Sequence, residues 1–142
     1  MTVEVRTERL RLETRGRNQI IDLSEDISAI VRKSGLSEGQ ATVFAIGSTA
    51  GITVIEYEPG LVETDLPALF ERLAPYGADY AHHATWGDDN GAAHLRASLL
   101  GGSYVVPFQN AMLILGQWQQ VVYVDFDTRP RRREIVVQLL GR

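Results

Sequence analysis

The stretch ATVFAIGSTAGITVIEY, residues 41–57, contains the pattern that decides the fold. Residues 41–46 are apolar except for Thr42, and a β-branched run resumes at residues 52–57 after a row of small residues. Short apolar runs rich in β-branched residues and bounded by glycine are typical of buried strands. We therefore predict two strands joined by the loop Gly47-Ser48-Thr49-Ala50-Gly51.

The segments on both sides of this stretch predict an α+β order. Further strands are expected at residues 3–12, 104–108, 112–115, 119–127 and 134–140, with turns at Gly16-Arg17-Asn18 and Asn110-Ala111. Helices are expected at residues 23–33, capped by Ser24 and stopped by Gly35; from a cap at Thr64 or Asp65 to Leu73; and at residues 92–100. Residues 75–91 are expected to form a long polar loop, of the kind that is often functional. The total is about seven strands and three helices.

The composition limits the classes of function. The chain has 142 residues, which suits one domain, and no cysteine, which excludes disulfide scaffolds, thiol catalysis and iron–sulfur clusters. A net charge of −4 does not favour a nucleic-acid binder. The longest uncharged stretch, residues 97–124, contains proline, asparagine and glutamines, so no membrane span is expected. The charged N-terminal residues do not look like a signal peptide, and we expect a cytoplasmic protein.

The three histidines of the chain, His82, His83 and His94, lie within 13 residues, together with Asp88, Asp89 and Asn90. Imidazoles and carboxylates grouped in this way can bind a divalent metal or transfer protons. A polar surface loop with one buried histidine is the other interpretation, and the residues leave both open.

Two further groups of residues suit anions. Ser48 and Thr49 lie in a small-residue loop whose N–H and hydroxyl groups could bind phosphate, although a tight connection explains the loop as well. The turn Arg129-Pro130-Arg131-Arg132-Arg133 is either an anion clamp or a solvated hairpin, and Arg96 is one more anion candidate. Glu56 is either a site carboxylate or a surface residue. Trp118 and its glutamine neighbours indicate an interface or a pocket wall.

Several of these motifs resemble the YjbQ-like family. They are, in chain order, residues 47–53, 55–60, 94–101 and 115–120, and then the stretch from Phe126-Asp127 to Arg133. The resemblance implies a compact single-domain α+β fold over residues 1–142, a mixed or antiparallel β sandwich, and a homotrimer. Some members are named secondary thiamine-phosphate synthases, which implies coupling of a pyrimidine pyrophosphate with a thiazole phosphate.

The resemblance also implies a site. The catalytic group would be His94 with His82 and His83, and the phosphate contacts would be Ser48, Thr49, Asn90, Arg96 and Arg131. A divalent metal, Zn²⁺ or Mg²⁺, is expected on the three histidines. The family pattern, however, has histidine where this chain has Gly47 and Ala92, so Glu56, Asp88 or Asp89 would have to complete the ligand set.

Two functions of other classes stay in view. One is a non-catalytic trimeric protein that binds a phosphorylated metabolite. The other is a nucleic-acid-associated module that uses the arginine turn, which the acidic net charge disfavours.

Overall fold

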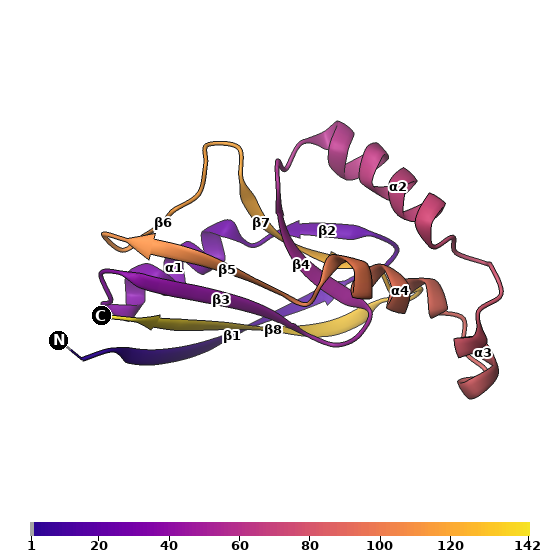
Figure 1. The fold of residues 1–142 in the computed structure, drawn as a ribbon, viewed down its shortest axis with the longest axis horizontal. Coiled ribbons are helices and arrows are strands. Elements are labelled where there is room, and N and C mark those ends of the chain that lie inside the picture. Colours follow the sequence, from indigo (N-terminus) through magenta and orange to yellow (C-terminus); the bar gives the residue numbers. More distant parts are fainter. Residues whose placement is uncertain (1) are drawn as a thin grey trace.

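The structure is a computed structural model that describes residues 2–142, and two β-sheets and a helical layer make up its body (Figure 1). Its elements are, in order, β1 (Glu4–Thr14), β2 (Gln19–Asp22), α1 (Ser24–Ser34), β3 (Gly39–Ile46), β4 (Ala50–Ile55), the π-helical turn η1 (Leu61–Asp65), α2 (Leu66–Leu73), α3 (Ala81–Trp86), α4 (Gly91–Leu100), β5 (Ser103–Gln109), β6 (Met112–Leu113), β7 (Gln120–Asp125) and β8 (Arg131–Gly141). The expected α+β class is confirmed.

One sheet has the order β1-β8-β3-β5-β6 and the other β2-β7-β4, and all neighbouring strands are antiparallel. Alternate residues of β7 face opposite sides, so that Val121 and Tyr123 pack into the core between the sheets with Val137 of β8 and Ile27 of α1. This core is the interior of the expected sandwich.

The other face of the three-stranded sheet carries a second core. Val122 and Val124 of β7 and the following Phe126 pack there with Phe70 of α2 and Ala97 of α4. Helices α2 and α4 thus form a third layer beyond the smaller sheet (Figure 1). The outer face of the larger sheet carries exposed apolar side chains, among them Phe44, Ile46, Val105 and Leu140.

The structure corrects several expected elements. β2 was not expected, because four residues are too short for a period-2 signal. The expected loop at residues 75–91 contains α3, and the second helix starts early, as η1, without a side-chain cap from Asp65. Ser24 does not cap α1 either, because its Oγ accepts the Val121 N–H.

Two expected turns are confirmed. Asn110 and Ala111 both have positive φ, 53° and 58°, as a two-residue type I′ hairpin between β5 and β6 requires. Gly16, Arg17 and Asn18 also have positive φ, and the chain reverses there between β1 and β2. Gly35 stops α1 in the left-handed conformation, as expected.

Five strand ends meet at one edge of the sandwich and build the floor of the candidate site. Ala50, the first residue of β4, is opposite Asp125, the last of β7. Thr14, the last residue of β1, is opposite Arg131, the first of β8. β3 ends at the same edge, where Ile46 is opposite Glu134 of β8.

Candidate functional site

Two histidine rings in contact mark the centre of the site. The His82 ring on α3 and the His94 ring on α4 have centroids 4.4 Å apart and are tilted by 42°. His83 turns away from His94, since its Nε2 accepts the Gly91 N–H at 2.9 Å and so ties α3 to the start of α4. The structure therefore brings His82 and His94 together, and gives His83 a role in holding the two helices.

Burial and the neighbouring His82 lower the pKa of His94 below its ordinary value. Asp127, the Ser48 backbone and Asp88 act in the opposite direction but do not cancel this effect. His94 is therefore mostly neutral at pH 7, with one ring nitrogen to donate and one to accept.

Two buried polar atoms beside this pair have no hydrogen-bond partner within the described part of the chain. They are His82 Nδ1 and Asn90 Oδ1, and Asn90 is only 4% exposed. Buried polar atoms are almost always satisfied in folded proteins, so an orphaned atom indicates a place for water or ligand. Tyr123 carries the third orphaned atom, a hydroxyl in the core between the sheets, and burial raises its pKa.

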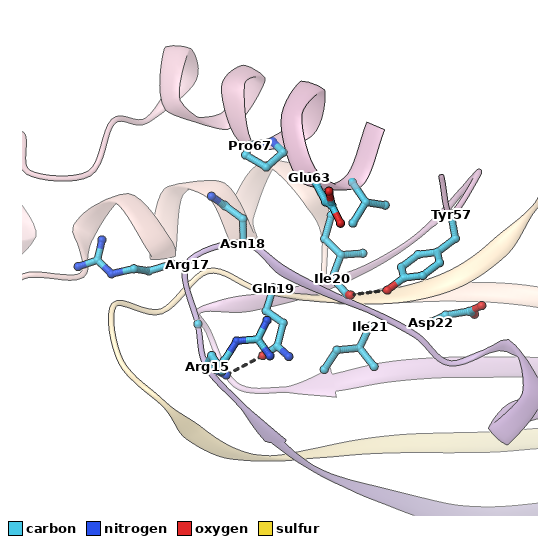
Figure 2. Close-up of a pocket in the computed structure, with 12 residues that line it drawn as sticks. Arg15, Arg17, Asn18, Gln19, Ile20, Ile21, Asp22, Tyr57, Glu63 and Pro67 are labelled. Atoms are coloured by element: carbon cyan, nitrogen blue, oxygen red, sulfur yellow. Dashed lines mark hydrogen bonds between the residues drawn. The ribbon is translucent and has the colours of Figure 1, made fainter. Parts of the chain in front are cut away.

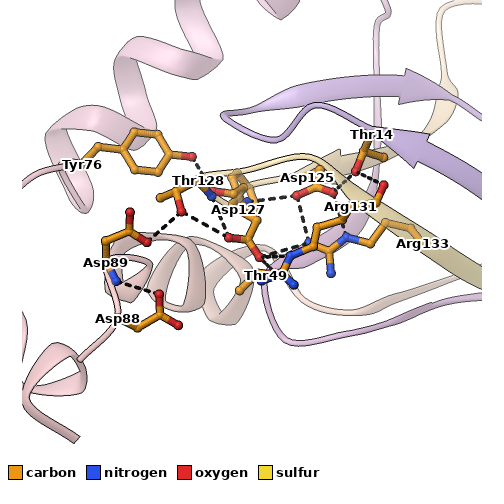
Figure 3. A network of polar contacts seen from close by, with 11 residues as sticks. Thr14, Thr49, Tyr76, Asp88, Asp89, Asp125, Asp127, Thr128, Arg131 and Arg133 are labelled. Carbon is orange, nitrogen blue, oxygen red and sulfur yellow. Dashed lines mark hydrogen bonds and ion pairs between the residues drawn. The ribbon is translucent and has the colours of Figure 1, made fainter. Parts of the chain in front are cut away.

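Behind the Ser48-Thr49 loop lies a buried network of two carboxylates and two arginines (Figure 3). Asp125 accepts hydrogen bonds from Arg133 Nε at 2.8 Å and Nη2 at 2.9 Å, and also from the Thr14 hydroxyl. Asp127 accepts from Arg131 Nε at 2.9 Å and from the Thr49 hydroxyl at 3.0 Å. Both carboxylates are buried, so both need these cationic partners.

Electrostatics within this network favour the charged forms. Burial alone would raise the pKa of Asp127, but hydrogen bonds from the Thr128 N–H, Thr49 and Arg131 lower it below its ordinary value. For Arg133, burial alone would lower the pKa, and the hydrogen bonds to Asp125 raise it above its ordinary value. Both groups are therefore ionised at neutral pH.

The predicted phosphate contacts are not all in one place. Ser48 is exposed at the loop surface, Thr49 is buried in the network, and Arg131 is bound to Asp127. Arg96 lies elsewhere: it is fully buried, donates to Ala74 O, Asn18 Oδ1 and Glu71 Oε2, and its guanidinium lies 3.8 Å from the centre of the Tyr76 ring. Arg96 is therefore not part of the site around His82 and His94.

The predicted metal ligands do not all come together. Glu56 is exposed just beyond the far end of β4, six residues from Ala50. A strand rises about 3.3 Å per residue, which places Glu56 about 20 Å from the end where the Ser48-Thr49 loop lies. Asp89 instead accepts a hydrogen bond from the Thr128 hydroxyl at 2.9 Å. Across residues 2–142, no group of three or more histidine and carboxylate side chains is arranged to hold a metal ion.

A cavity of about 940 Å³ lies away from these residues, between β2 and the segment η1–α2 (Figure 2). Its lining includes Arg15, Gln19, Tyr57 and Glu63 but none of the predicted site residues. The Tyr57 hydroxyl donates to the Ile20 carbonyl within it. The cavity and the predicted site residues are therefore in different places. The candidate site is the one around His82 and His94, because the orphaned polar atoms lie there.

Sequence reasoning missed Asp125, Asp127 and Thr14 as parts of the site. A signal was available, because Asp125 is a carboxylate at an inward-facing position of the apolar run Val121–Phe126. Arg133 likewise stands at an inward position of β8, two residues before Ile135. A buried acidic side chain needs a cationic partner, so a buried acid and a buried arginine near neighbouring strand ends are expected to pair.

Comparison of the sequence with known proteins identifies the family. The model of the family described as UPF0047 protein YjbQ-like matches residues 8–142. The chain belongs to this family. A UPF0047 protein of Methanothermobacter thermautotrophicus is 38% identical over 99% of this chain and 95% of its own length. The UPF0047 protein YugU of Bacillus subtilis is 31% identical over 93% of this chain and 97% of its own length.

Solved structures of the YjbQ-like family agree with the fold. A YbjQ-like protein of unknown function from Sulfolobus solfataricus has a TM-score of 0.92 at 30% identity, covering 99% of this chain and all of that chain. A UPF0047 family protein from Clostridium acetobutylicum has a TM-score of 0.84 at 33% identity, covering 93% and 98%. Within residues 2–142, no helix has the length and hydrophobicity to cross a membrane.

Proposed function

We propose that this YjbQ-like chain binds a diphosphate-bearing metabolite beside His82 and His94 and acts as a secondary thiamine-phosphate synthase. The observation that carries the binding site is the pair of buried, orphaned atoms, His82 Nδ1 and Asn90 Oδ1, next to a neutral His94. The reaction itself comes from the family resemblance. In that coupling a thiazole nitrogen attacks the pyrimidine methylene carbon, the carbon–oxygen bond breaks, and inorganic pyrophosphate leaves.

Three features support leaving-group stabilisation as the task of these residues. The departing pyrophosphate needs hydrogen-bond donors placed where its negative charge grows. Ser48 offers a hydroxyl at the exposed loop, and a hydrogen bond between the His94 ring and the Ser48 backbone holds the imidazole beside it. His82 Nδ1 donates in the tautomer that carries the ring proton there, whereas Asn90 Oδ1 can only accept and suits a bridging water.

The experiment is a product assay with both thiamine precursors. We expect thiamine phosphate and pyrophosphate from the unchanged chain, and a loss of at least about a hundredfold in His94→Ala, the usual range for a positioned donor in the active site. Arg132→Gln is the control, because Arg132 is 93% exposed and meets only Glu13. Equal activity in the unchanged chain and His94→Ala would contradict the assignment.

The second candidate function is non-catalytic binding of a phosphorylated metabolite. The absence of an assembled metal group in residues 2–142 favours it, because the chain then lacks one usual stabiliser of a leaving pyrophosphate. Saturable binding of the pyrimidine pyrophosphate without any product would establish this function over the first.

We also propose that the chain is a homotrimer in the cytoplasm, with the outer face of the larger sheet at the contact between copies. Phe44 is 48% and Val105 47% exposed on that face, and apolar patches of this kind mark interfaces. Phe44→Glu should lower the mass measured by light scattering to that of one chain. Leu73→Glu, on α2 in the opposite layer, should leave the mass unchanged.

A further inference from the structure

The structure gives a physical reason for the glycine at position 47. Its φ is +131°, in the region that favours glycine. A Cβ built on Gly47 would lie 2.9 Å from Arg133 Nη1, closer than real Cβ contacts come. The space in which a side chain at this position would begin is therefore occupied by a guanidinium group.

Arg133 cannot easily leave this position. It is only 8% exposed, and it is held by two hydrogen bonds to Asp125 and one, at 2.7 Å, to the Thr49 hydroxyl. These bonds use Nε and Nη2, so that Nη1 is the edge of the guanidinium directed at the exposed Gly47-Ser48 loop. Moving Arg133 would leave the Asp125 charge buried without its partner.

The two arginines also occupy the two buried carboxylates of the network, Asp125 and Asp127. Hard cations such as Mg²⁺ bind through carboxylate oxygens. Here the oxygens of Asp125 are bound to Arg133, and Asp127 is bound to Arg131 and Thr49. A metal would have to displace a bidentate arginine pair, one of the stronger interactions available to a carboxylate.

We propose that Arg133 is the fixed cation of this site in place of a metal, and that its Nη1 edge with the Gly47-Ser48 loop forms a metal-independent subsite for a phosphate or diphosphate group. This inference rests on the proposed function, whose anion site it specifies. Guanidinium suits the task because its planar donors match phosphate oxygens and because it stays charged at all physiological pH values.

The test is calorimetric titration of inorganic pyrophosphate into the full chain after treatment with EDTA. Pyrophosphate should bind equally well before and after chelation, and ZnCl₂ alone should give no saturable heat. Arg133→Lys keeps the positive charge but loses the planar, bidentate donors of guanidinium. The affinity for pyrophosphate should therefore fall about tenfold, the equivalent of about 1.4 kcal/mol. Arg132→Lys is the matched control, because Arg132 is 93% exposed and meets only Glu13, at 3.8 Å.

Gly47→Ala keeps the test decisive if Arg133→Lys does not fold. Its added Cβ crowds Nη1 while the bonds of Arg133 to Asp125 can persist, so pyrophosphate affinity should again fall about tenfold. Binding that appears only with zinc, or full affinity in both variants, would overturn the inference and leave the proposed anion site standing. No pyrophosphate binding under any condition would overturn the proposed function as well.

Discussion

Replacing Asp125 with asparagine removes one charge from the buried network and keeps the size of the side chain. Asp125 is fully buried, and its carboxylate accepts two hydrogen bonds from Arg133, one from Thr14 and one from the Asp127 N–H. The asparagine amide group is a donor, so it opposes at least one of the guanidinium N–H groups.

The size of the effect follows from these contacts. Two charge-assisted hydrogen bonds at about 1.5 kcal/mol each give a loss of about 3 kcal/mol in the free energy of unfolding. Breaking one side of a buried ion pair costs a similar amount, about 3–5 kcal/mol. Both partners are buried, so solvent screens the attraction between Asp125 and Arg133 very little. The ratio of folded to unfolded chains should fall more than a hundredfold.

The assay is urea unfolding of Asp125→Asn beside Glu13→Gln. Glu13 pairs with Arg132 at 3.8 Å, but both side chains are exposed, at 86% and 93%, so its replacement should change nothing measurable. In a double-mutant cycle, Arg133→Gln added to Asp125→Asn should cost less than the sum of the two single changes. Equal stability of Asp125→Asn and Glu13→Gln would refute the reasoning.

Three further predictions concern protons and a turn. The imidazole signals of His94 should titrate below the ordinary histidine pKa in NMR spectra, and His82→Ala should raise that pKa, because His82 is one cause of the shift. Asp127 has a lowered pKa in the folded state, so its contribution to stability is complete above about pH 4 and is lost on further acidification. In Asp127→Asn the free energy of unfolding, measured below about pH 4, should therefore depend less on pH than in the unchanged chain. Ala111→Gly should stabilise the chain by about 1 kcal/mol in urea, because Ala111 has a φ of 58°; a loss of stability there would contradict the strain argument.

Much of the fold was predictable from local pattern. The strands at residues 41–46 and 134–140 were predicted because alternation and β-branching act over neighbouring residues. The hairpin at Asn110-Ala111 was predicted because a two-residue turn has a narrow choice of residues. β2 and α3 were not predicted, since four and six residues are too few for a period to emerge.

The histidine segment was also predictable as a place of interest, because its three imidazoles are close in the sequence. The different partners of these histidines were not predictable. His82 contacts His94 while His83 bonds to Gly91, although His82 and His83 are chain neighbours. Successive residues of a helix point about 100° apart, so adjacent histidines face different surroundings.

The sequence by itself determined most of the strands, the two turns and the region of the site, because each depends on residues within a few positions of one another. Only the tertiary structure decided which partners the buried arginines meet. Arg96 is enclosed by Asn18 and Glu71, and Arg133 reaches Thr49, 84 positions away along the chain, with Gly47 leaving it room. The free energy of a buried charge depends on partners that meet only when the two sheets pack, and no local pattern contains that information.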